Sequence, residues 1–375
     1  MNTVGIPREV KTGERRVGLT PQGVSELKGH GLRVVVERGA GAGSGYSDRD
    51  YVAAGAELAR DAAAVYGTCD LIQKVKEPIA QEFHLLREGQ VLFCFLHLAS
   101  PEQCDLVRAL EAARVTAIAF ETLEVGDKRP LLAPMSEVAG ALAVAYGAYF
   151  RSCNLFAAES LHLPDDFRQQ MQAIADVYPN PPEGLSLGRV MIFGGGVAGI
   201  KAMEFAQALG GEVTVIEKNA AKREAIPATA LAPEEITQAL LAESEMLLGC
   251  VHQTGARALH VLDEQMFRAM SRLRPKLIMD VAIDQGGNFP ESHSTTYDEP
   301  LYRDSLGNIR FAVANIPAYC GRGASDALTA ASVSYTEAMA VNFEEALQKF
   351  PELRSAVNVR GGKLLDLKIR EAHKK

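Results

Sequence analysis

The sequence has no apolar run of about 18 residues, so we expect no membrane-spanning helix. The first residues form a short apolar run followed by charged sequence, which does not fit a secretory signal peptide. The six cysteines are scattered singly and none forms a C-x-x-C pair, which argues against a metal site and favours a reduced, cytoplasmic protein. Basic residues are outnumbered, 39 to 47, and the net charge of −8 disfavours nucleic acid as a partner.

The 375 residues are enough for about two domains. Strand-like apolar segments alternate with helical patterns, which predicts an α/β protein with two doubly wound parallel-sheet (Rossmann-like) domains, separated by a cleft and bridged by long helices. The expected strands are residues 3–6, 32–37, 71–78 (running into a loop), 91–98, 115–120, 190–193, 213–216, 246–251, 276–281 and 311–317. The expected helices are residues 21–29, 48–54, 61–66, 134–159, 202–209, 233–243 and 325–347.

A glycine-rich turn organises the second half of the chain. The apolar run 190–193 ends in Gly194-x-Gly196-x-x-Gly199, and a helical pattern begins at once. In a dinucleotide-binding unit the first glycine permits the turn, the second lets the backbone approach a pyrophosphate, and the third lets helix and strand pack closely. Val197 and Ala198 would begin the helix whose N–H groups face the phosphates. The alternative is a tight strand–helix turn that binds no ligand.

The second strand of this unit ends in Glu217, about 20 residues past the glycines. A carboxylate there would accept a hydrogen bond from a ribose 2′-hydroxyl and repel a 2′-phosphate, which favours NAD over NADP. Lys218, beside it, weakens this preference for NAD because its charge would attract a 2′-phosphate.

The helix over 134–159 is expected to lead out of the first domain, and the polar, proline-rich residues 161–188 form a linker before the glycine strand. The helix over 325–347 is expected to return to the first domain. The substrate domain would then be discontinuous and the nucleotide-binding domain inserted into it. We predict a substrate (catalytic) domain of residues 1–135 and 318–375, and an NAD-binding domain of residues 136–317 that includes the bridging helix and the linker.

Three ionisable residues are expected at the carboxyl ends of strands, where ligands bind in a doubly wound sheet. They are Lys76, His97 and Asp284. Each has a structural alternative: Lys76 could be a solvated strand end, His97 a packed core histidine, and Asp284 a turn aspartate of the following Gln285–Gly287 loop. Lys74, two residues before Lys76, is the second choice for a ligand-binding lysine at this strand end.

Several motifs together resemble the alanine dehydrogenase/pyridine nucleotide transhydrogenase family over nearly the whole chain. They are Gly5–Glu9, Glu14-x-Arg16-Val17, Lys74–Pro78, Phe95–Ala99, Leu132–Gly140, Asp280–Gly287 and Val313–Ala318. The resemblance implies an NAD-dependent amino-acid dehydrogenase that reversibly deaminates L-alanine to pyruvate and ammonia. It also implies a homo-oligomer, a hexamer or a dimer, that binds a small 2-oxo acid or amino acid and no membrane.

The resemblance also implies residue roles. Reduction of a 2-oxo acid needs a group that binds the substrate carboxylate, and a guanidinium suits this role because it can donate two hydrogen bonds. Composition alone allows Arg15 or Arg16, or an arginine that is merely solvated. The resemblance selects Arg16. Lys76 would hold the substrate oxygen, and His97 would donate and accept the proton. Asp284 would orient ammonia or the nicotinamide ribose. The remaining implied contacts are Met135 and Asn315 with the substrate, and Ser136, Asp284 and Asn315 with the cofactor, beside Gly194, Gly196, Val197, Ala198, Gly199 and Glu217.

Two other functions stay open. An opine- or saccharopine-type dehydrogenase joins an amino acid to a 2-oxo acid, and the atypical linker 161–188 with a short segment after Glu217 would leave room for a second amino acid. A non-catalytic, transhydrogenase-like NAD-binding protein is the other alternative, but it would need no oxo-acid pocket and hence no Arg16, Lys76 or His97.

Overall fold

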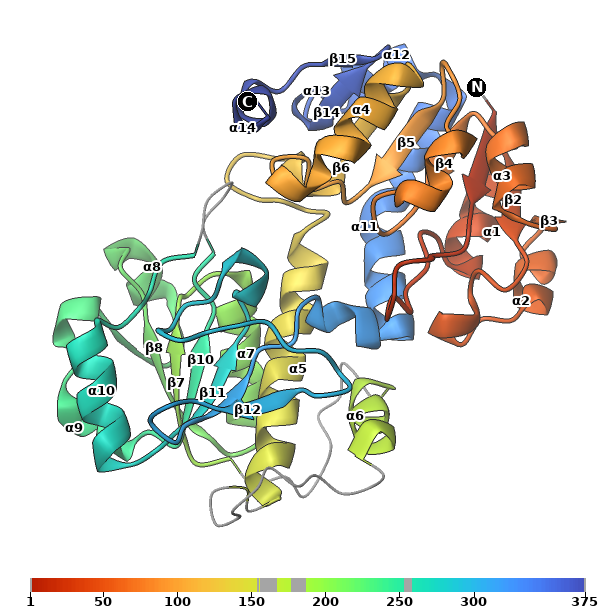
Figure 1. Ribbon diagram of the computed structural model, residues 1–375. Coiled ribbons are helices and arrows are strands. Elements are labelled where there is room, and N and C mark those ends of the chain that lie inside the picture. The colour runs from red at the N-terminus through yellow and green to blue at the C-terminus, as the bar shows by residue number, and fades with distance from the viewer. Residues whose placement is uncertain (1, 154, 156–166, 177–186, 253–257, 374–375) are drawn as a thin grey trace. The chain divides into compact units, whose positions relative to one another are not determined.

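The computed structural model describes residues 2–153, 155, 167–176, 187–252 and 258–373 (Figure 1). The chain divides into two compact units: unit 1 comprises Met1–Met135 with Ala318–Lys375, and unit 2 comprises Ser136–Pro317. The assignment of unit 1 to the substrate and of unit 2 to NAD stays a prediction. Most of the linker 161–188, including Asp165 and Asp166, lies outside the described residues.

Unit 1 is built on an eight-stranded sheet in the order β15-β14-β6-β5-β4-β1-β2-β3. The strands are β1 (Thr3–Ile6), β2 (Arg33–Glu37), β3 (Glu57–Ala59), β4 (Leu71–Gln73), β5 (Val91–Cys94), β6 (Thr116–Ala119), β14 (Val357–Arg360) and β15 (Lys363–Leu364). All neighbouring pairs from β3 to β6 are parallel, whereas β14 and β15 add an antiparallel edge. The chain moves outward from β1 to β3, then restarts at β4 on the other side, so the topological switch point lies between β1 and β4.

Helices cover both faces of this sheet. They are α1 (Pro21–Gly29), α2 (Asp48–Ala53), α3 (Ala62–Thr68), α4 (Cys104–Ala112), α11 (Gly321–Val341), α12 (Phe343–Lys349), α13 (Leu353–Ala356) and α14 (Leu367–Ala372). Side chains alternate along a strand, so adjacent residues of β4 report on opposite faces. Ile72 belongs to the apolar core that includes Val65 of α3 and Leu106 of α4, while Gln73 donates to the hydroxyl of Ser332 in α11, 3.0 Å away.

Unit 2 has a seven-stranded sheet in the order β12-β13-β11-β10-β7-β8-β9. The strands are β7 (Arg189–Phe193), β8 (Glu212–Ile216), β9 (Thr229–Leu231), β10 (Met246–Gly249), β11 (Leu277–Asp280), β12 (Leu301–Arg303) and β13 (Ile309–Phe311). Only β12 runs antiparallel to its neighbour. The switch point lies between β7 and β10, directly beside the glycine turn. The α/β fold with two largely parallel, doubly wound sheets is thereby confirmed.

The helices of unit 2 also lie on both sheet faces. They are α5 (Ala133–Ser152), which begins in unit 1, α6 (Phe167–Asp176), α7 (Val197–Ala208), α8 (Ala220–Ala225), α9 (Gln238–Glu243) and α10 (Glu264–Leu273). Leu247 of β10 packs in a core with Leu241 of α9 and Phe267 of α10. The preceding residue Met246 points to the opposite face, where its sulfur would meet a side chain at Gly147 of α5. Burial on both faces explains why β10 and β11 are continuously apolar up to their last residue.

Several expected helices have different ends. The helix expected over 325–347 begins four residues earlier, at Gly321, and is broken at Asn342, whose side chain accepts from the amides of Glu344 and Glu345 and caps α12. A side chain at Gly321 would lie 2.4 Å from the carbonyl oxygen of Gly43, so only glycine allows this start. The expected helix over 233–243 is instead a 3₁₀ turn (Pro233–Glu235) followed by α9, because the Thr237 hydroxyl caps a new helix at the Leu240 amide. The bridging helix ends at Ser152 rather than near residue 159.

Several strands are shorter than expected. The strand expected over 71–78 ends at Gln73, that over 91–98 ends at Cys94, and that over 311–317 is displaced to Ile309–Phe311. In each case the chain continues past the strand end into a largely buried loop. Lys76, His97 and Asn315 consequently lie in loops beyond the strands rather than on them.

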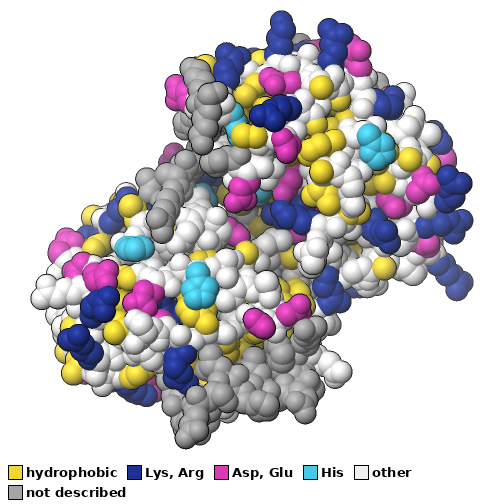
Figure 2. Space-filling view, viewed as in Figure 1, with side chains coloured by type: hydrophobic (Ala, Val, Ile, Leu, Met, Phe, Trp, Pro, Cys, Tyr) yellow, Lys and Arg dark blue, Asp and Glu magenta, His cyan; other side chains and the backbone are white. Residues whose placement is uncertain are grey.

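None of the helices among the described residues has the length and apolar character that a membrane crossing requires. Figure 2 shows acidic and basic side chains interspersed over the visible face of each unit.

Candidate functional site

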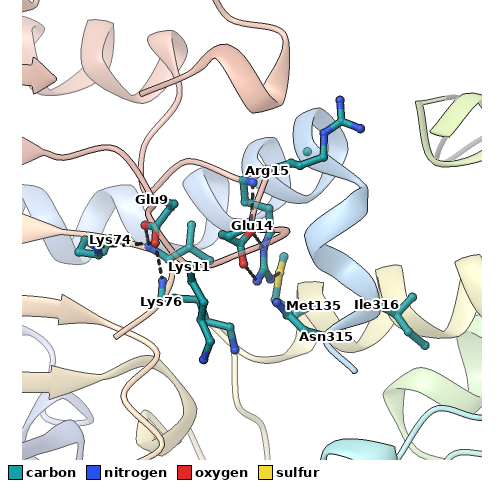
Figure 3. Close-up of polar contacts among 12 residues, drawn as sticks. Glu9, Lys11, Glu14, Arg15, Lys74, Lys76, Met135, Asn315 and Ile316 are labelled. Atoms are coloured by element: carbon teal, nitrogen blue, oxygen red, sulfur yellow. Dashed lines mark hydrogen bonds and ion pairs between the residues drawn. The ribbon is translucent and has the colours of Figure 1, made fainter. Parts of the chain in front are cut away.

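The loop after β1 begins at the switch point of unit 1 and carries Arg16. The Arg16 side chain is buried, and its Nε and Nη2 donate to the two carboxylate oxygens of Glu14 at 2.7 and 2.5 Å. Nη1 lies 3.0 Å from the sulfur of Met135. Burial alone would raise the pKa of Glu14, but the Arg16 charge outweighs it and holds that pKa below its usual value. Glu14 therefore stays ionised and fixes the orientation of the Arg16 guanidinium. Figure 3 shows Glu14 and Met135 on the same side of this loop.

The neighbouring Arg15 points elsewhere. Its guanidinium carbon lies 5.8 Å from the ring centre of Tyr319, and Figure 3 shows the side chain directed away from Glu14 and Met135. The two arginines, which composition could not distinguish, thus have different surroundings, and only Arg16 lies beside Met135.

Lys74 and Lys76 both lie in the loop after β4 and differ in the same way. The Lys74 ammonium is buried, 2.5 Å from Glu82 and 3.8 Å from Glu9. Burial would lower the pKa of Lys74, but these two carboxylates outweigh it and raise that pKa. Lys74 therefore stays protonated, and its charge is balanced by these carboxylates within the fold, which disfavours it as a substrate-binding residue.

Lys76 is half-buried and has the opposite electrostatics. Burial lowers its pKa below the usual lysine value, and the nearby charge of Arg16 lowers it further. The structure thus brings Lys76 and Arg16 together as two cationic side chains at one switch point. Glu9 fixes this loop, because its carboxylate accepts the amide hydrogens of Val75 at 2.6 Å and Lys76 at 3.3 Å.

His97 follows β5, the strand beside β4. Its side chain is exposed, so the alternative of a packed core histidine does not apply. The imidazole stacks on the buried ring of Phe95, with 5.9 Å between ring centres and 8° between planes. His97 adopts a left-handed backbone conformation, φ 50°. Arg16, Lys76 and His97 therefore occupy loops after three adjacent strands, β1, β4 and β5.

In unit 2 the three glycines after β7 have distinct structural roles. Gly194 has φ 102°, a conformation open to glycine. A methyl group on Gly199 would lie 1.8 Å from the carbonyl oxygen of Gly194, so helix α7 could not approach the strand. At Gly196 no atom of the described residues, chain neighbours aside, would come within 4 Å of such a group. Gly194 thus permits the turn, Gly199 permits close packing of helix on strand, and Gly196 leaves the backbone open to an approaching ligand, which we call the open approach. A pyrophosphate site requires all three.

Helix α7 begins with Val197 and Ala198, and its N-terminal amides border the open approach at Gly196. The bridging helix packs closely on this start, because a side chain at Gly140 would lie 2.1 Å from the carbonyl oxygen of Ala198. Ser136 lies one turn before Gly140 on the same face of α5.

Glu217 directly follows β8 and lies beside the glycine turn. One carboxylate oxygen accepts the Gly195 amide at 2.9 Å, and the other accepts the Asn219 amide at 2.8 Å. The Arg223 guanidinium donates to the carbonyl oxygens of Glu217 and Lys218, so a cation also lies nearby.

Asp284 and Asn315 meet after two neighbouring strands. Asp284 does not end β11, as the sequence suggested; it lies in a 3₁₀ turn (Ile283–Gln285), four residues beyond the strand end at Asp280. Its exposed carboxylate accepts a hydrogen bond from the backbone N–H of Asn315, 3.2 Å away. Asn315 has φ 56°, and its loop follows β13.

Sequence reasoning missed the carboxylates that orient these cations. Glu14 and Glu9 lie in a charged loop that would ordinarily be solvated, yet both are buried against lysine or arginine. The close spacing of Glu14 and Arg16 was the available signal. Among the described residues, histidines, cysteines and carboxylates form no cluster of three or more that could hold a metal ion.

Comparisons with known proteins agree over nearly the whole chain. The model of the alanine dehydrogenase/PNT N-terminal domain matches residues 5–139, and that of the C-terminal domain matches residues 163–366. Alanine dehydrogenase of Bacillus subtilis is 39% identical over 96% of this chain and 91% of its own, and that of Methanococcus maripaludis is 35% identical over 99% and 96%.

Solved structures give the same result. An L-alanine dehydrogenase superposes with a TM-score of 0.83 at 31% identity, covering 99% of this chain and 98% of its own. A transhydrogenase from Sinorhizobium meliloti shares the fold, with a TM-score of 0.76 at 23% identity over 97% and 99%. From the switch-point loops of both units and from these full-length matches, the chain belongs to the alanine dehydrogenase/PNT family.

Proposed function

We propose that this protein is an NAD-dependent amino-acid dehydrogenase that reversibly converts L-alanine to pyruvate and ammonia. The observation that carries the proposal is the grouping of Arg16, Lys76 and His97 in loops after three adjacent strands of unit 1. A pure nucleotide-binding protein has no use for a buried, oriented guanidinium beside a lysine of lowered pKa.

The carboxylate of the substrate would bind Arg16. Because Glu14 occupies its Nε–Nη2 edge, the guanidinium is held in one orientation and loses little freedom when it binds. Lys76 would donate to the substrate oxygen or nitrogen at C2. The sulfur of Met135 is adjacent to Arg16 and would limit the side chain of the substrate, which favours pyruvate over longer 2-oxo acids.

Proton transfer would fall to His97, because an imidazole both donates and accepts near neutral pH. In the direction of deamination it would take the proton from the water that attacks the imine carbon. In the direction of amination it would return that proton to the departing oxygen. Its ring is exposed and stacks on Phe95, so it would face the substrate from the surface of unit 1.

The residues of unit 2 fit a dinucleotide. The open approach at Gly196, the amides of Val197 and Ala198 and the carboxylate of Glu217 would hold its pyrophosphate and ribose. When bound, NAD accepts a hydride from C2 of alanine. Asp284 and Asn315, joined by a hydrogen bond, would contact the nicotinamide end, and Ser136 would contribute from α5. Glu217 makes NAD the preferred cofactor.

The test is NADH oxidation with pyruvate, 2-oxobutyrate and 2-oxoglutarate, each with ammonium or with a free amino acid as amine donor. We expect turnover to require ammonium and to be highest with pyruvate. Efficient use of lysine or ornithine, with no turnover on ammonium, would replace this proposal with an opine-type dehydrogenase. Absence of turnover with NADH bound normally would favour the transhydrogenase-like alternative.

A second test addresses the proton donor. His97→Ala should lower kcat about 10²- to 10⁴-fold, the usual contribution of general acid–base catalysis, and leave NADH affinity unchanged because unit 2 carries the cofactor residues. Turnover close to that of the wild type would contradict the role of His97. We further expect the protein to be cytoplasmic. We also expect a homo-oligomer, a hexamer or a dimer, and light scattering would measure its mass.

A further inference from the structure

The backbone of the His97 turn is unusual and needs support from outside the turn. His97 has φ 50°, a conformation that non-glycine residues seldom adopt. The turn is closed by a hydrogen bond from the Ser100 amide to the His97 carbonyl oxygen, 3.0 Å long. Its imidazole is exposed although Leu96 and Leu98 on either side are buried. Fixing this backbone therefore decides where the imidazole points.

A single carboxylate binds the two consecutive amides that enter this turn. Oε1 of Glu121 accepts the His97 N–H at 2.7 Å, and Oε2 accepts the Leu96 N–H at 3.2 Å. Glu121 lies in a 3₁₀ turn (Phe120–Thr122) directly after β6, which is hydrogen-bonded to β5 along its length. The anchor is thus attached to the neighbouring strand, and bonds to an ionised acceptor are stronger than neutral ones.

The carbonyl group of Leu98 is held by a different side chain. His373, just beyond α14, places Nε2 2.6 Å from the Leu98 carbonyl oxygen, and its Nδ1 lies 3.0 Å from the sulfur of Cys104. A carbonyl oxygen only accepts, so Nε2 donates. Three successive residues of the turn are therefore bound by side chains outside it, and Glu121 is the one that binds the His97 amide.

We propose that Glu121 is a positioning residue that holds the His97 backbone in its left-handed conformation and so aims the imidazole at the substrate. This inference rests on the catalytic role proposed for His97. Both oxygens are needed because two amide hydrogens must be accepted. Glutamine would keep one acceptor and set an NH₂ group against the other amide, and alanine would remove both acceptors.

The experiment measures kcat, KM for pyruvate, NADH affinity and the pH profile of kcat/KM for Glu121→Gln and Glu121→Ala, each alone and combined with His97→Ala. Displacement of a reacting group by about 1 Å costs on the order of 10²-fold in rate. We expect a loss of roughly 100-fold in kcat for alanine and a smaller one for glutamine, with NADH affinity unchanged. Both variants remove the charge of Glu121, so any shift of the apparent pKa in the pH profile should be the same in the two, whereas the loss in kcat should differ.

In the His97→Ala background, removal of Glu121 should lower kcat by less than about 3-fold further, because the effects of residues that act as one unit are not additive. The matched control is Glu111→Gln, an exposed glutamate on α4, which should resemble the wild type. Thermal unfolding of each variant shows whether it folds; if the alanine variant does not, the glutamine variant supplies the same comparison.

The outcomes separate the two hypotheses. If His97→Ala retains wild-type turnover, the proposed role of His97 is wrong. If His97→Ala is strongly impaired while folded Glu121 variants are fully active, the positioning role of Glu121 is wrong and the catalytic role of His97 stands. Losses that multiply in the double variant, or equal losses in kcat for the glutamine and alanine variants, would equally overturn positioning through the backbone.

Discussion

One substitution made at two glycines of the same turn should have opposite consequences. At Gly196 the backbone is extended (φ −80°, ψ −172°), which any residue adopts, and a methyl group would meet no described residue beyond its chain neighbours. Alanine is a poorer helix N-cap by about 1 kcal/mol, and its smaller unfolded-state entropy offsets roughly half of that. Gly196→Ala should therefore change the free energy of unfolding by less than about 1 kcal/mol.

The same methyl group would occupy the space that a pyrophosphate needs. Crowding of one methyl group costs about 1–3 kcal/mol, so the Kd for NADH should rise roughly 5- to 150-fold. At Gly199 the methyl group would lie 1.8 Å from the Gly194 carbonyl oxygen, and backbone atoms would have to move. Gly199→Ala should therefore lower the free energy of unfolding by about 3 kcal/mol or more.

The assay combines fluorescence titration with NADH and urea denaturation. Gly67→Ala in α3 is the control, because its methyl group would meet no described residue within 4 Å and the site lies in unit 1. Wild-type NADH affinity in Gly196→Ala would refute the assignment of the open approach to the cofactor. Wild-type stability of Gly199→Ala would refute the close contact between α7 and the turn.

Three further predictions concern charged residues. Arg16→Lys keeps the charge but loses the bidentate fork, so KM for pyruvate should rise about 10-fold or more, whereas Arg15→Lys should behave as wild type; equal effects would remove the distinction. Glu217→Gln should raise the use of NADPH relative to NADH about fivefold or more, since charges about 4 Å apart interact by about 1 kcal/mol even in water, and an unchanged ratio would contradict the ribose role. Burial raises the pKa of Glu9 from 4.5 to about 7. Its contribution to stability is therefore complete below pH 4.5 and is lost as the pH rises through about 7, so the free energy of unfolding, relative to that of Glu9→Gln, should fall over this window by up to roughly 3 kcal/mol. A difference between the two proteins that stays constant or rises with pH in urea denaturation would contradict this.

The fold and the glycine turn could be predicted because local pattern determines them. Apolar runs, the Gly194-x-Gly196-x-x-Gly199 spacing and a terminal Glu217 are contiguous signals, and each corresponds to an observed element. Helix ends were predicted less well where long-range packing sets them. Gly321 starts α11 because Gly43, far away in sequence, approaches its backbone, and nothing near Gly321 in the sequence indicates this contact.

The choice between neighbouring cations could not be made from the residues alone. Lys74 and Lys76 are equivalent in sequence, and what separates them is the buried Glu82 beside one and Arg16 near the other. Arg15 and Arg16 differ likewise through Tyr319 and Met135. Selection of Arg16 and Lys76 came from the family resemblance, because the partners that distinguish them are set by the tertiary fold.

The most direct test of the proposed reaction follows atoms into the product. The protein is incubated with pyruvate, ¹⁵N-ammonium and NADH deuterated at C4, in separate experiments for each face of the nicotinamide, and alanine is isolated for mass spectrometry and chiral analysis. Reductive amination with direct hydride transfer should give L-alanine that carries ¹⁵N in its amino group and, for one of the two deuterated faces, deuterium at C2. Unlabelled alanine, alanine without ¹⁵N, or a secondary amine formed from an added amino acid would contradict the proposed function.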